Sequence, residues 1–300
     1  VPVSQDVMNP GSPGALSNFV SMLGDDARAI DPEELNEQMH GADPILQEDE
    51  KVVLAYKAGR DTFVMTTKRI FIIDKKGFTG KRVAYISVPY TSIRAFAVES
   101  AGSFDNDSEV KIWTKTYWSV EGGVGNKLDQ DLRKGKADIV AIQEYLATQV
   151  IGTADGSSSL APDHTAAEAG KVDSFLSFVS DNAVALEPSK VKEQLTENVP
   201  ILQSDEDVDA VYKIGRDMCV FTTKRILAID RQGLTGKKVE YRSFPLRYVR
   251  AYRIRTAGKV IGSAEVEVYS DGSRSVEQDL AKSSSDVWTV QKILANKTLK

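Results

Sequence analysis

The sequence contains few of the side chains on which enzymes and metal sites depend. Among 300 residues there is one cysteine, Cys219, and there are two histidines, His40 and His164. A single cysteine excludes an internal disulfide and indicates an intracellular or organellar setting. An enzyme needs a titratable group tuned to its reaction, and neither histidine has a cysteine or a carboxylate cluster at metal-ligand spacing. We therefore expect no enzymatic activity, no catalytic residue, no metal and no cofactor.

Long apolar runs and phosphate-binding loops are missing as well. No run of 18 or more apolar residues occurs, so no membrane-spanning helix is expected. The glycine-rich segment Gly122–Gly125 does not open a helix directly, so we interpret it as a turn rather than as a phosphate-binding loop.

The charge is distributed unevenly along the chain. The net charge is −5, but residues 15–150 are net acidic and residues 171–300 are net basic. A nucleic-acid-binding protein is usually basic over a whole face, so no nucleic-acid partner is expected. Opposite signs in the two halves favour head-to-tail contact between copies, although small net charges of this kind also arise without function.

The most informative feature is an internal repeat. Residues 44–102 match residues 200–258 at a constant offset of 156, and about 32 of the 59 positions are identical. Near the end of each repeat, Asp129–Leu132 matches Glu277–Leu280 at an offset of 148, so repeat one carries about eight extra residues after Trp113. We predict two domains, residues 15–150 and 171–300, with a flexible tail over residues 1–14 and a linker over residues 151–170.

Each repeat has the pattern of a small mainly β fold with helices at its ends. In repeat one we expect short N-terminal helices, one over Ala15–Leu23 and one beginning at Asp31, and a C-terminal helix over Asp129–Val150. Runs rich in β-branched and aromatic residues predict strands between them at Val52–Lys57, Asp61–Thr67, Arg69–Asp74, Val83–Val88, Ile93–Ser100 and Glu109–Thr114. The predicted fold class is α+β, as two tandem sandwiches or partly open barrels, each capped by its C-terminal helix.

These residues resemble the bacterial pleckstrin-homology (PH) domain family. In repeat one the resemblance rests on Thr66–Ile70, Asp74, Gly77–Lys81, Val88–Tyr90, Glu99–Asp105 and Glu109. Repeat two keeps Thr222–Ile226, Asp230, Gly233, Thr235–Lys237, Pro245, Ala257 and Gly258, and it departs at Arg255 and Lys259–Gly262. The resemblance implies a bent seven-stranded sheet with a C-terminal helix, in a family known for oligomer formation more than for catalysis.

The tandem pair with its N-terminal extension also resembles the pyrenoid shell protein family of diatoms. That family forms a protein sheet around the Rubisco matrix of the chloroplast. The resemblance implies a position in the chloroplast stroma at the pyrenoid surface, with Rubisco or another matrix protein as a partner. Without it, we expect an intracellular soluble protein.

The duplication itself predicts self-assembly. Two similar but non-identical domains give one chain two binding faces, and contacts between such faces can propagate instead of closing. We predict a structural protein whose main partner is itself and which tiles into a sheet or shell. The alternative is a tandem PH-like adaptor that binds lipid or peptide. The phosphate-binding candidates for that alternative are basic residues retained in both repeats, Lys57, Arg60, Lys213 and Arg216. Lys68-Arg69, which recurs as Lys224-Arg225, could also coordinate a phosphate, although solvated charge is the alternative interpretation.

Differences between the repeats indicate where copies meet. Alternation along the strand places Phe96 and Val98 inward, and Ala97 and Glu99 outward. Repeat two has arginines at the outward positions and at two further sites, which predicts a basic stripe of Arg242, Arg247, Arg253 and Arg255. Its predicted acidic partners in a neighbouring copy are Glu99, Asp105 and Asp107, together with Glu109. A solvated strand face is the alternative interpretation.

The extra segment of repeat one is a second candidate contact. It carries Tyr117 and Trp118, and Trp113 precedes it. Large aromatic residues in a segment without a counterpart predict a projecting loop that binds another copy. Two alternatives stay open: Trp118 folds back onto its own sheet, or the tail over residues 1–14 adds to the sheet edge of a neighbour.

Overall fold

The computed structural model describes most of both repeats. It covers residues 28–41, 44–76, 82–101, 107–120, 123–133, 137–152, 186–233, 238–256, 264–271, 276–280 and 284–299. The predicted tail, the predicted helix over Ala15–Leu23, nearly all of the predicted linker, His164 and Asp105 lie outside the described residues. The chain divides into two compact units, residues 1–87 and 88–300.

The first unit is a five-stranded antiparallel sheet with one helix. Its order is β1 (Arg28–Ala29), β2 (Val52–Ala58), β3 (Asp61–Thr66), β4 (Arg69–Lys76) and β5 (Arg82–Pro89), the last two residues of which belong to the second unit. Helix α2 (Pro32–Met39) begins as predicted, because the Asp31 carboxylate accepts hydrogen bonds from the backbone N–H groups of Glu33 (2.8 Å) and Glu34 (3.3 Å). Leu35 and Met39 of α2 are buried in one core cluster with strand residues of the sheet.

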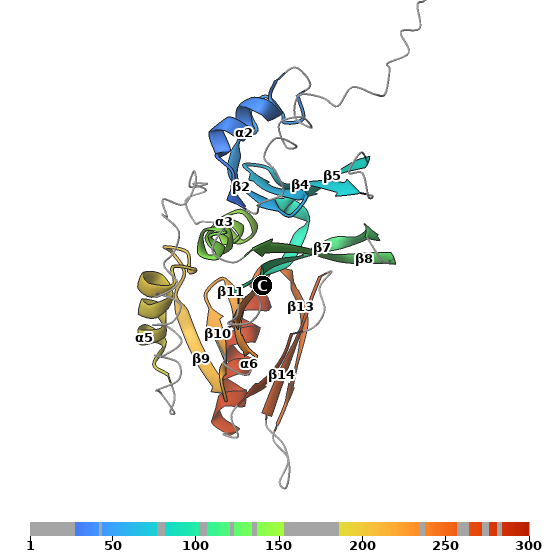
Figure 1. The fold of residues 1–300 in the computed structure, drawn as a ribbon. Coiled ribbons are helices and arrows are strands. Elements are labelled where there is room, and N and C mark those ends of the chain that lie inside the picture. Colours follow the sequence, from blue (N-terminus) through green and yellow to red (C-terminus); the bar gives the residue numbers. More distant parts are fainter. Residues whose placement is uncertain are drawn as a thin grey trace, which may run out of the picture. The chain divides into compact units, whose positions relative to one another are not determined.

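The second unit joins half of repeat one to all of the described part of repeat two (Figure 1). Its larger sheet has the order β8-β7-β6-β12-β11-β10-β9, and its smaller sheet has the order β13-β14-β15. Repeat one contributes β6 (Ile93–Glu99), β7 (Asp107–Val120), β8 (Gly123–Arg133) and helix α3 (Ile139–Ile151). Repeat two contributes β9 (Val208–Ile214), β10 (Asp217–Thr222), β11 (Arg225–Gln232), β12 (Lys238–Pro245), β13 (Val249–Arg255), β14 (Ala264–Ser270), β15 (Val276–Leu280) and the helices α5 (Pro188–Glu193) and α6 (Ser284–Thr298).

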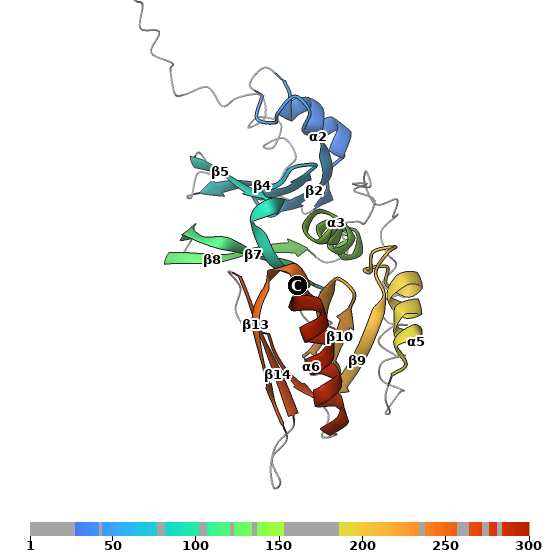
Figure 2. The same ribbon diagram turned by 180° about the vertical axis from the view of Figure 1, so that it is seen from behind.

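Two helices of repeat two lie against its strands. Helix α5 lies beside β9 (Figure 1), and α6 runs along the strands and packs on β13 (Figure 2). A short π-helix (Gln194–Asn198) follows α5, and single 3-10 turns (Tyr90–Ser92 and Leu246–Tyr248) precede β6 and β13. No helix among the described residues is long and apolar enough to cross a membrane.

The two repeats share one sheet, because β6 of repeat one pairs antiparallel with β12 of repeat two. The register places Phe96 opposite Ser243 and Glu99 opposite Glu240. Helix α3 packs on both strands. We call β6, β12 and α3 together the repeat junction. Every side chain of β6 is buried there, so the prediction that Ala97 and Glu99 face outward is wrong.

The predicted fold class, mainly β with a few helices, is confirmed, but the C-terminal helix of each repeat is shorter than predicted. Residues 129–133 belong to strand β8, in which Leu132 lies opposite Ser108 of β7. Helix α3 begins only after Asp138, whose carboxylate caps the N–H groups of Val140 (3.0 Å) and Ala141 (2.9 Å). Pairing with β7 favoured the strand over the helical spacing, as pairing with β14 does for the equivalent Glu277–Leu280 in β15. The extra residues of repeat one lengthen this hairpin instead of forming a separate loop.

Candidate functional site

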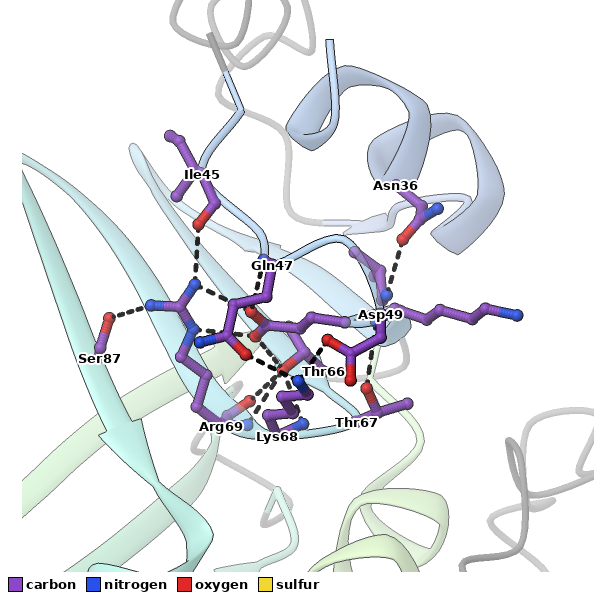
Figure 3. Close-up of polar contacts among 12 residues, drawn as sticks. Asn36, Ile45, Gln47, Asp49, Thr66, Thr67, Lys68, Arg69 and Ser87 are labelled. Atoms are coloured by element: carbon purple, nitrogen blue, oxygen red, sulfur yellow. Dashed lines mark hydrogen bonds and ion pairs between the residues drawn. The ribbon is translucent and has the colours of Figure 1, made fainter.

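An arginine–glutamate pair organises the first unit (Figure 3). Both nitrogen donors on one side of the Arg69 guanidinium bind Glu50, Nε to Oε1 at 2.9 Å and Nη2 to Oε2 at 3.1 Å. The same guanidinium donates to the backbone oxygen of Ile45 (2.9 Å) and to Oγ of Ser87 (2.8 Å). Thr66 donates to Glu50 from its hydroxyl (2.7 Å). The pair therefore ties the segment before β2 to β4 and β5.

Local structure explains why these side chains meet. In the tight turn between β3 and β4, Oγ1 of Thr66 accepts hydrogen bonds from the backbone N–H groups of Lys68 (3.1 Å) and Arg69 (3.0 Å). Burial raises the pKa of Glu50, but hydrogen bonds from Arg69 and Thr66 outweigh burial and hold that pKa below its usual value. A carboxylate occupied in this way holds strands together and has no proton to transfer.

The same site occurs in repeat two, where it is sealed from water. Arg225 binds Glu206 through Nε (2.9 Å) and Nη2 (3.0 Å), and its Nη1 donates to Ser243 Oγ (2.9 Å). The Arg225 side chain is 0% exposed, whereas that of Arg69 is 21% exposed. The difference comes from α3, because Gln143 donates from Nε2 to Ser243 Oγ (2.9 Å) and covers the site.

Lysines beside the two sites follow the same pattern. Lys68 Nζ contacts Asp49 Oδ1 at 2.5 Å and Gln47 Oε1 at 2.7 Å, and its hydrogen bond lowers the pKa of Asp49 (Figure 3). Lys224 contacts Asp205, and it also donates to the backbone oxygen of Gly152 at the end of α3 (2.9 Å). The repeat junction therefore forms hydrogen bonds with both Lys224 and Arg225 of repeat two.

Lys111 of β7 lies at the centre of a buried ion cluster at the repeat junction. Its Nζ lies 2.9 Å from Glu99, 2.9 Å from Glu240 and 3.1 Å from Glu109. Burial lowers the pKa of Lys111, but hydrogen bonds from Glu240 and Glu99 outweigh burial and raise that pKa above its usual value. Lys238 binds the second oxygen of Glu99 at 2.5 Å. Carboxylates from both repeats are thus held by one ammonium group.

The predicted charged contacts are divided among several places. Glu99 belongs to the buried cluster, and Arg242 pairs with Glu240 beside it. Arg247 donates to the backbone oxygens of Val150 and Ile151 at the end of α3. Arg242 therefore lies in the repeat junction and Arg247 contacts it from the turn Leu246–Tyr248, so the two do not continue one exposed stripe.

The rest of the predicted set lies at strand positions outside the junction. Arg253 and Arg255 are exposed on β13 and pair with acids of β14, as Arg255 lies 2.6 Å from Glu265 and Arg253 lies 3.4 Å from Glu267. Asp107 begins β7, opposite Arg133 of β8. Binding of these residues to a second copy stays a prediction.

The predicted aromatic contact is an extended hairpin. Trp113 packs against the core of repeat two, and Lys127 Nζ lies 5.6 Å from the centre of its ring. Tyr117 is exposed on the same strand. The backbone of Trp118 lies opposite Gly125, and the structure does not describe the Trp118 side chain. Of the three aromatics, Tyr117 is therefore the one shown to be open to solvent.

The phosphate-binding candidates are used within the chain. Lys57 is buried and donates from Nζ to the backbone oxygen of Arg60 (3.0 Å). Arg216 donates to the backbone oxygen of Gly233 (3.0 Å), and Lys213 also has a partner within the chain. These contacts reduce what the four residues can offer to a phosphate.

Sequence reasoning considered Arg69 and Arg225 as phosphate ligands, but it did not identify their pairing with Glu50 and Glu206 or the junction lysine. Glu50, Ser87 and their counterparts Glu206 and Ser243 are identical in the two repeats, and this retained identity was the available signal. Lys111 had no such signal, because its counterpart is Glu267.

Comparisons with known proteins agree with the tandem architecture. The sequence profile of the bacterial PH domain matches residues 19–150 and 175–298. Uncharacterized protein YjqA of Bacillus subtilis is 55% identical over 103 residues, which is 34% of this chain and 77% of that protein. Uncharacterized protein YozO of the same organism is 36% identical over 72 residues, which is 24% of this chain and 62% of that protein.

Two solved structures show the same kind of partial match. A DUF1696 family protein with a pleckstrin-homology domain from Shewanella loihica is 40% identical and covers 42% of this chain and 99% of its own, with a TM-score of 0.35. A PH-domain-containing protein from Exiguobacterium sibiricum is 17% identical and covers 57% of this chain and 74% of its own, with a TM-score of 0.31.

Proposed function

This chain belongs to the bacterial PH domain family as a tandem pair, and from that premise we propose that it is a non-enzymatic structural protein that assembles with copies of itself into a sheet or shell. The observation that carries the proposal is the repeat junction. Within one chain, the second half of one PH-like repeat already binds the first half of the next by extending its sheet from β6 to β12.

The strands that correspond to β12 and β6 in the other repeat, β5 and β13, are outer strands of their sheets. Strand β5 is the last strand of its sheet and β13 is the first strand of its own, so in the described part of the chain each has an edge without a neighbouring strand. Open strand edges pair readily with other chains. A contact between two different surfaces, here the edges of β5 and β13, can be formed again by each added copy without closing a ring. It therefore builds an extended assembly.

The resemblance to the pyrenoid shell family directs this proposal toward a shell around a Rubisco matrix. We therefore propose a position in the chloroplast stroma at the pyrenoid surface, with Rubisco or a matrix protein on one side of the sheet. A sheet needs contacts in two directions, and the exposed Tyr117 on the β7–β8 hairpin is available for the second direction.

Family membership also supports a second function, that of a tandem PH-like adaptor for lipid or peptide. Liposome flotation with phosphoinositide-containing vesicles tests this function. Binding that is abolished by Lys213→Glu and Arg216→Glu would support the adaptor. The engagement of Lys57 and Arg216 with backbone oxygens is the reason that we place this function second.

Electron microscopy and light scattering of the purified full chain test the structural function. We expect sheets, tubes or long polymers whose amount rises with protein concentration. A monodisperse monomer at every concentration and salt tested would rule out self-assembly. Rubisco mixed with the assemblies and pelleted with them tests the pyrenoid assignment separately.

A further inference from the structure

We propose that copies join head to tail by rebuilding the repeat junction between chains: β13 and α6 of one copy dock on β5 and the Arg69 site of the next. This inference rests on the proposed self-assembly and specifies the surface that carries it. The partner is a second copy of this chain, because both halves of the interface are repeats of halves that already bind each other inside one chain.

The strand correspondence is direct at the offset of 156. Strand β13 occupies the positions of β6, and β5 occupies the positions of β12. All seven side chains of β6 are buried, whereas on β13 only Val249 is buried. The same strand position is therefore covered in repeat one and open in repeat two. A strand laid beside β13 would restore the environment that β12 gives to β6.

The junction also defines the register of the proposed contact. Ser243 lies opposite Phe96 in the chain, so the corresponding pair between copies is Ser87 opposite Tyr252. At the junction, the Ser100 N–H donates to the Val239 oxygen (2.8 Å). In an antiparallel ladder, hydrogen-bonded pairs alternate with pairs that lack hydrogen bonds, so Val98 opposite Tyr241 and Phe96 opposite Ser243 are also hydrogen-bonded pairs. Between copies, Tyr85 opposite Ile254 and Ser87 opposite Tyr252 are then hydrogen-bonded pairs.

The helices show the same contrast. Helix α3 is buried on most sides, while α6 presents Trp288 to solvent (64% exposed). The counterpart of Trp288 at the offset of 148 is Val140, which is buried at the repeat junction in the core cluster of β10, β11 and β12. Leu299 (74% exposed) corresponds in the same way to the buried Ile151. In the proposed contact, Trp288 packs against the first unit of the next copy.

The receiving surface is the less buried of the two arginine–glutamate sites. In repeat two, Gln143 of α3 completes that site through Ser243. The counterpart of Gln143 is Gln291 of α6, and the counterpart of Ser243 is Ser87, which is exposed. Within one chain, Gln291 donates a long hydrogen bond of 3.3 Å to the Tyr252 hydroxyl. In the proposed contact, Gln291 would donate instead to Ser87 of the next copy.

The exposed apolar side chains support this assignment. Among the described residues, the large hydrophobic side chains that are exposed are Tyr85 (48%), Tyr117 (66%), Trp288 (64%) and Leu299 (74%). Three of the four correspond to residues buried at the repeat junction, namely Tyr241, Val140 and Ile151, and the fourth lies in the extra hairpin. The exposed large hydrophobic residues of the described chain thus correspond mainly to positions that the junction buries.

Two single substitutions test the head-to-tail contact, because each blocks one end. Trp288→Glu blocks the α6 and β13 end, and Tyr85→Glu blocks the β5 end. Both side chains are exposed, so each chain should fold as the wild type does, which circular dichroism and thermal unfolding check. Thr196→Glu is the control, since it places the same charge at an exposed position outside the proposed contact and outside the β7–β8 hairpin. We expect each blocking variant to weaken self-association by at least about tenfold and the control to keep head-to-tail chains.

A mixture of the two blocked variants gives the decisive result. Tyr85→Glu retains a free α6 and β13 end, and Trp288→Glu retains a free β5 end. Mixed at equal concentration, they should form a complex of twice the 32.9 kDa of one chain and nothing larger. Light scattering coupled to size exclusion measures this mass.

The outcomes separate this inference from the proposed function. If wild-type chains never associate, self-assembly itself is wrong. If wild-type chains associate and both blocked variants associate equally well, self-assembly stands and this interface is wrong. If the blocked variants are monomeric but do not form the mixed dimer, the two ends are not each other's partners and the interface is likewise overturned.

Discussion

Gln143 of repeat one donates a 2.9 Å hydrogen bond to Ser243 of repeat two, and Ser243 accepts a second from Arg225 at 2.9 Å. One serine hydroxyl thus connects the terminal helix of one PH-like domain to the arginine–glutamate site of the other. The contact joins the two repeats directly at this point. The equivalent serine of repeat one, Ser87, accepts a hydrogen bond from Arg69 and is exposed to solvent.

The two arginine–glutamate sites should differ in their contribution to stability. Removing the charge of a fully buried partner leaves the other charge without compensation and costs about 3–5 kcal/mol. We expect Glu206→Gln to destabilise the second unit by that amount and Glu50→Gln to cost less, because the Arg69 side chain reaches water. Urea unfolding measures both variants, with the exposed Glu48→Gln as the control. Equal losses at the two sites would contradict the role assigned to burial.

Glu50 should make the first unit sensitive to acid. Its pKa in the folded chain lies below the usual 4.5, so the unfolded chain takes up protons first as the pH falls. The stability that Glu50 contributes is fully present above about pH 4.5 and is lost as the pH falls through its folded pKa. The difference in unfolding free energy between wild type and Glu50→Gln should therefore be constant near pH 7 and shrink below pH 4.5. A difference that grows on acidification would show the opposite sign and refute this account.

Lys111 should be essential to the repeat junction. Replacing it with methionine leaves Glu99 and Glu240 buried opposite each other, and we expect a loss of about 3–5 kcal/mol. Hydrogen exchange should show faster exchange of β6 and β12 in this variant. The control is Lys127→Met, which removes a half-exposed ion pair with Asp129 and should cost less than about 1 kcal/mol. Unchanged exchange in Lys111→Met would show that the cluster does not hold the junction.

The register between copies can be tested by cross-linking. Ile86 and Arg253 correspond to the facing residues Arg242 and Ala97, a pair without hydrogen bonds, whose Cα atoms lie about 4.5 Å apart in such ladders. That separation suits a disulfide. The double variant Ile86→Cys with Arg253→Cys should therefore form covalent multimers on mild oxidation.

Two features make this cross-linking experiment specific. Native Cys219 is buried, and burial raises the pKa of its thiol to about 12, so it should stay unreactive while the chain is folded. Moving the second cysteine to position 250 displaces it by about 10 Å along the strand and should abolish cross-linking. Denaturing gels without reductant report both results. Equal cross-linking at the displaced position would show that the proposed register is wrong.

The sequence by itself determined the repeat, most of the strands, the start of α2 and the fold class, because turn residues, helix caps and alternating apolar residues act over a few positions. It did not determine the end of the hairpin, where Asp129–Arg133 pairs as a strand, since pairing with β7 outweighed the helical spacing of Leu132. Only the tertiary structure decided that β6 is covered and β13 is open. These strands occupy equivalent positions in the two repeats, although Arg253 and Arg255 of β13 replace Ala97 and Glu99 of β6. What covers β6 is the neighbouring strand β12 and helix α3. That pairing joins residues about 145 positions apart, so the exposed arginines of β13 are consistent with an open strand but do not by themselves identify which strand covers β6.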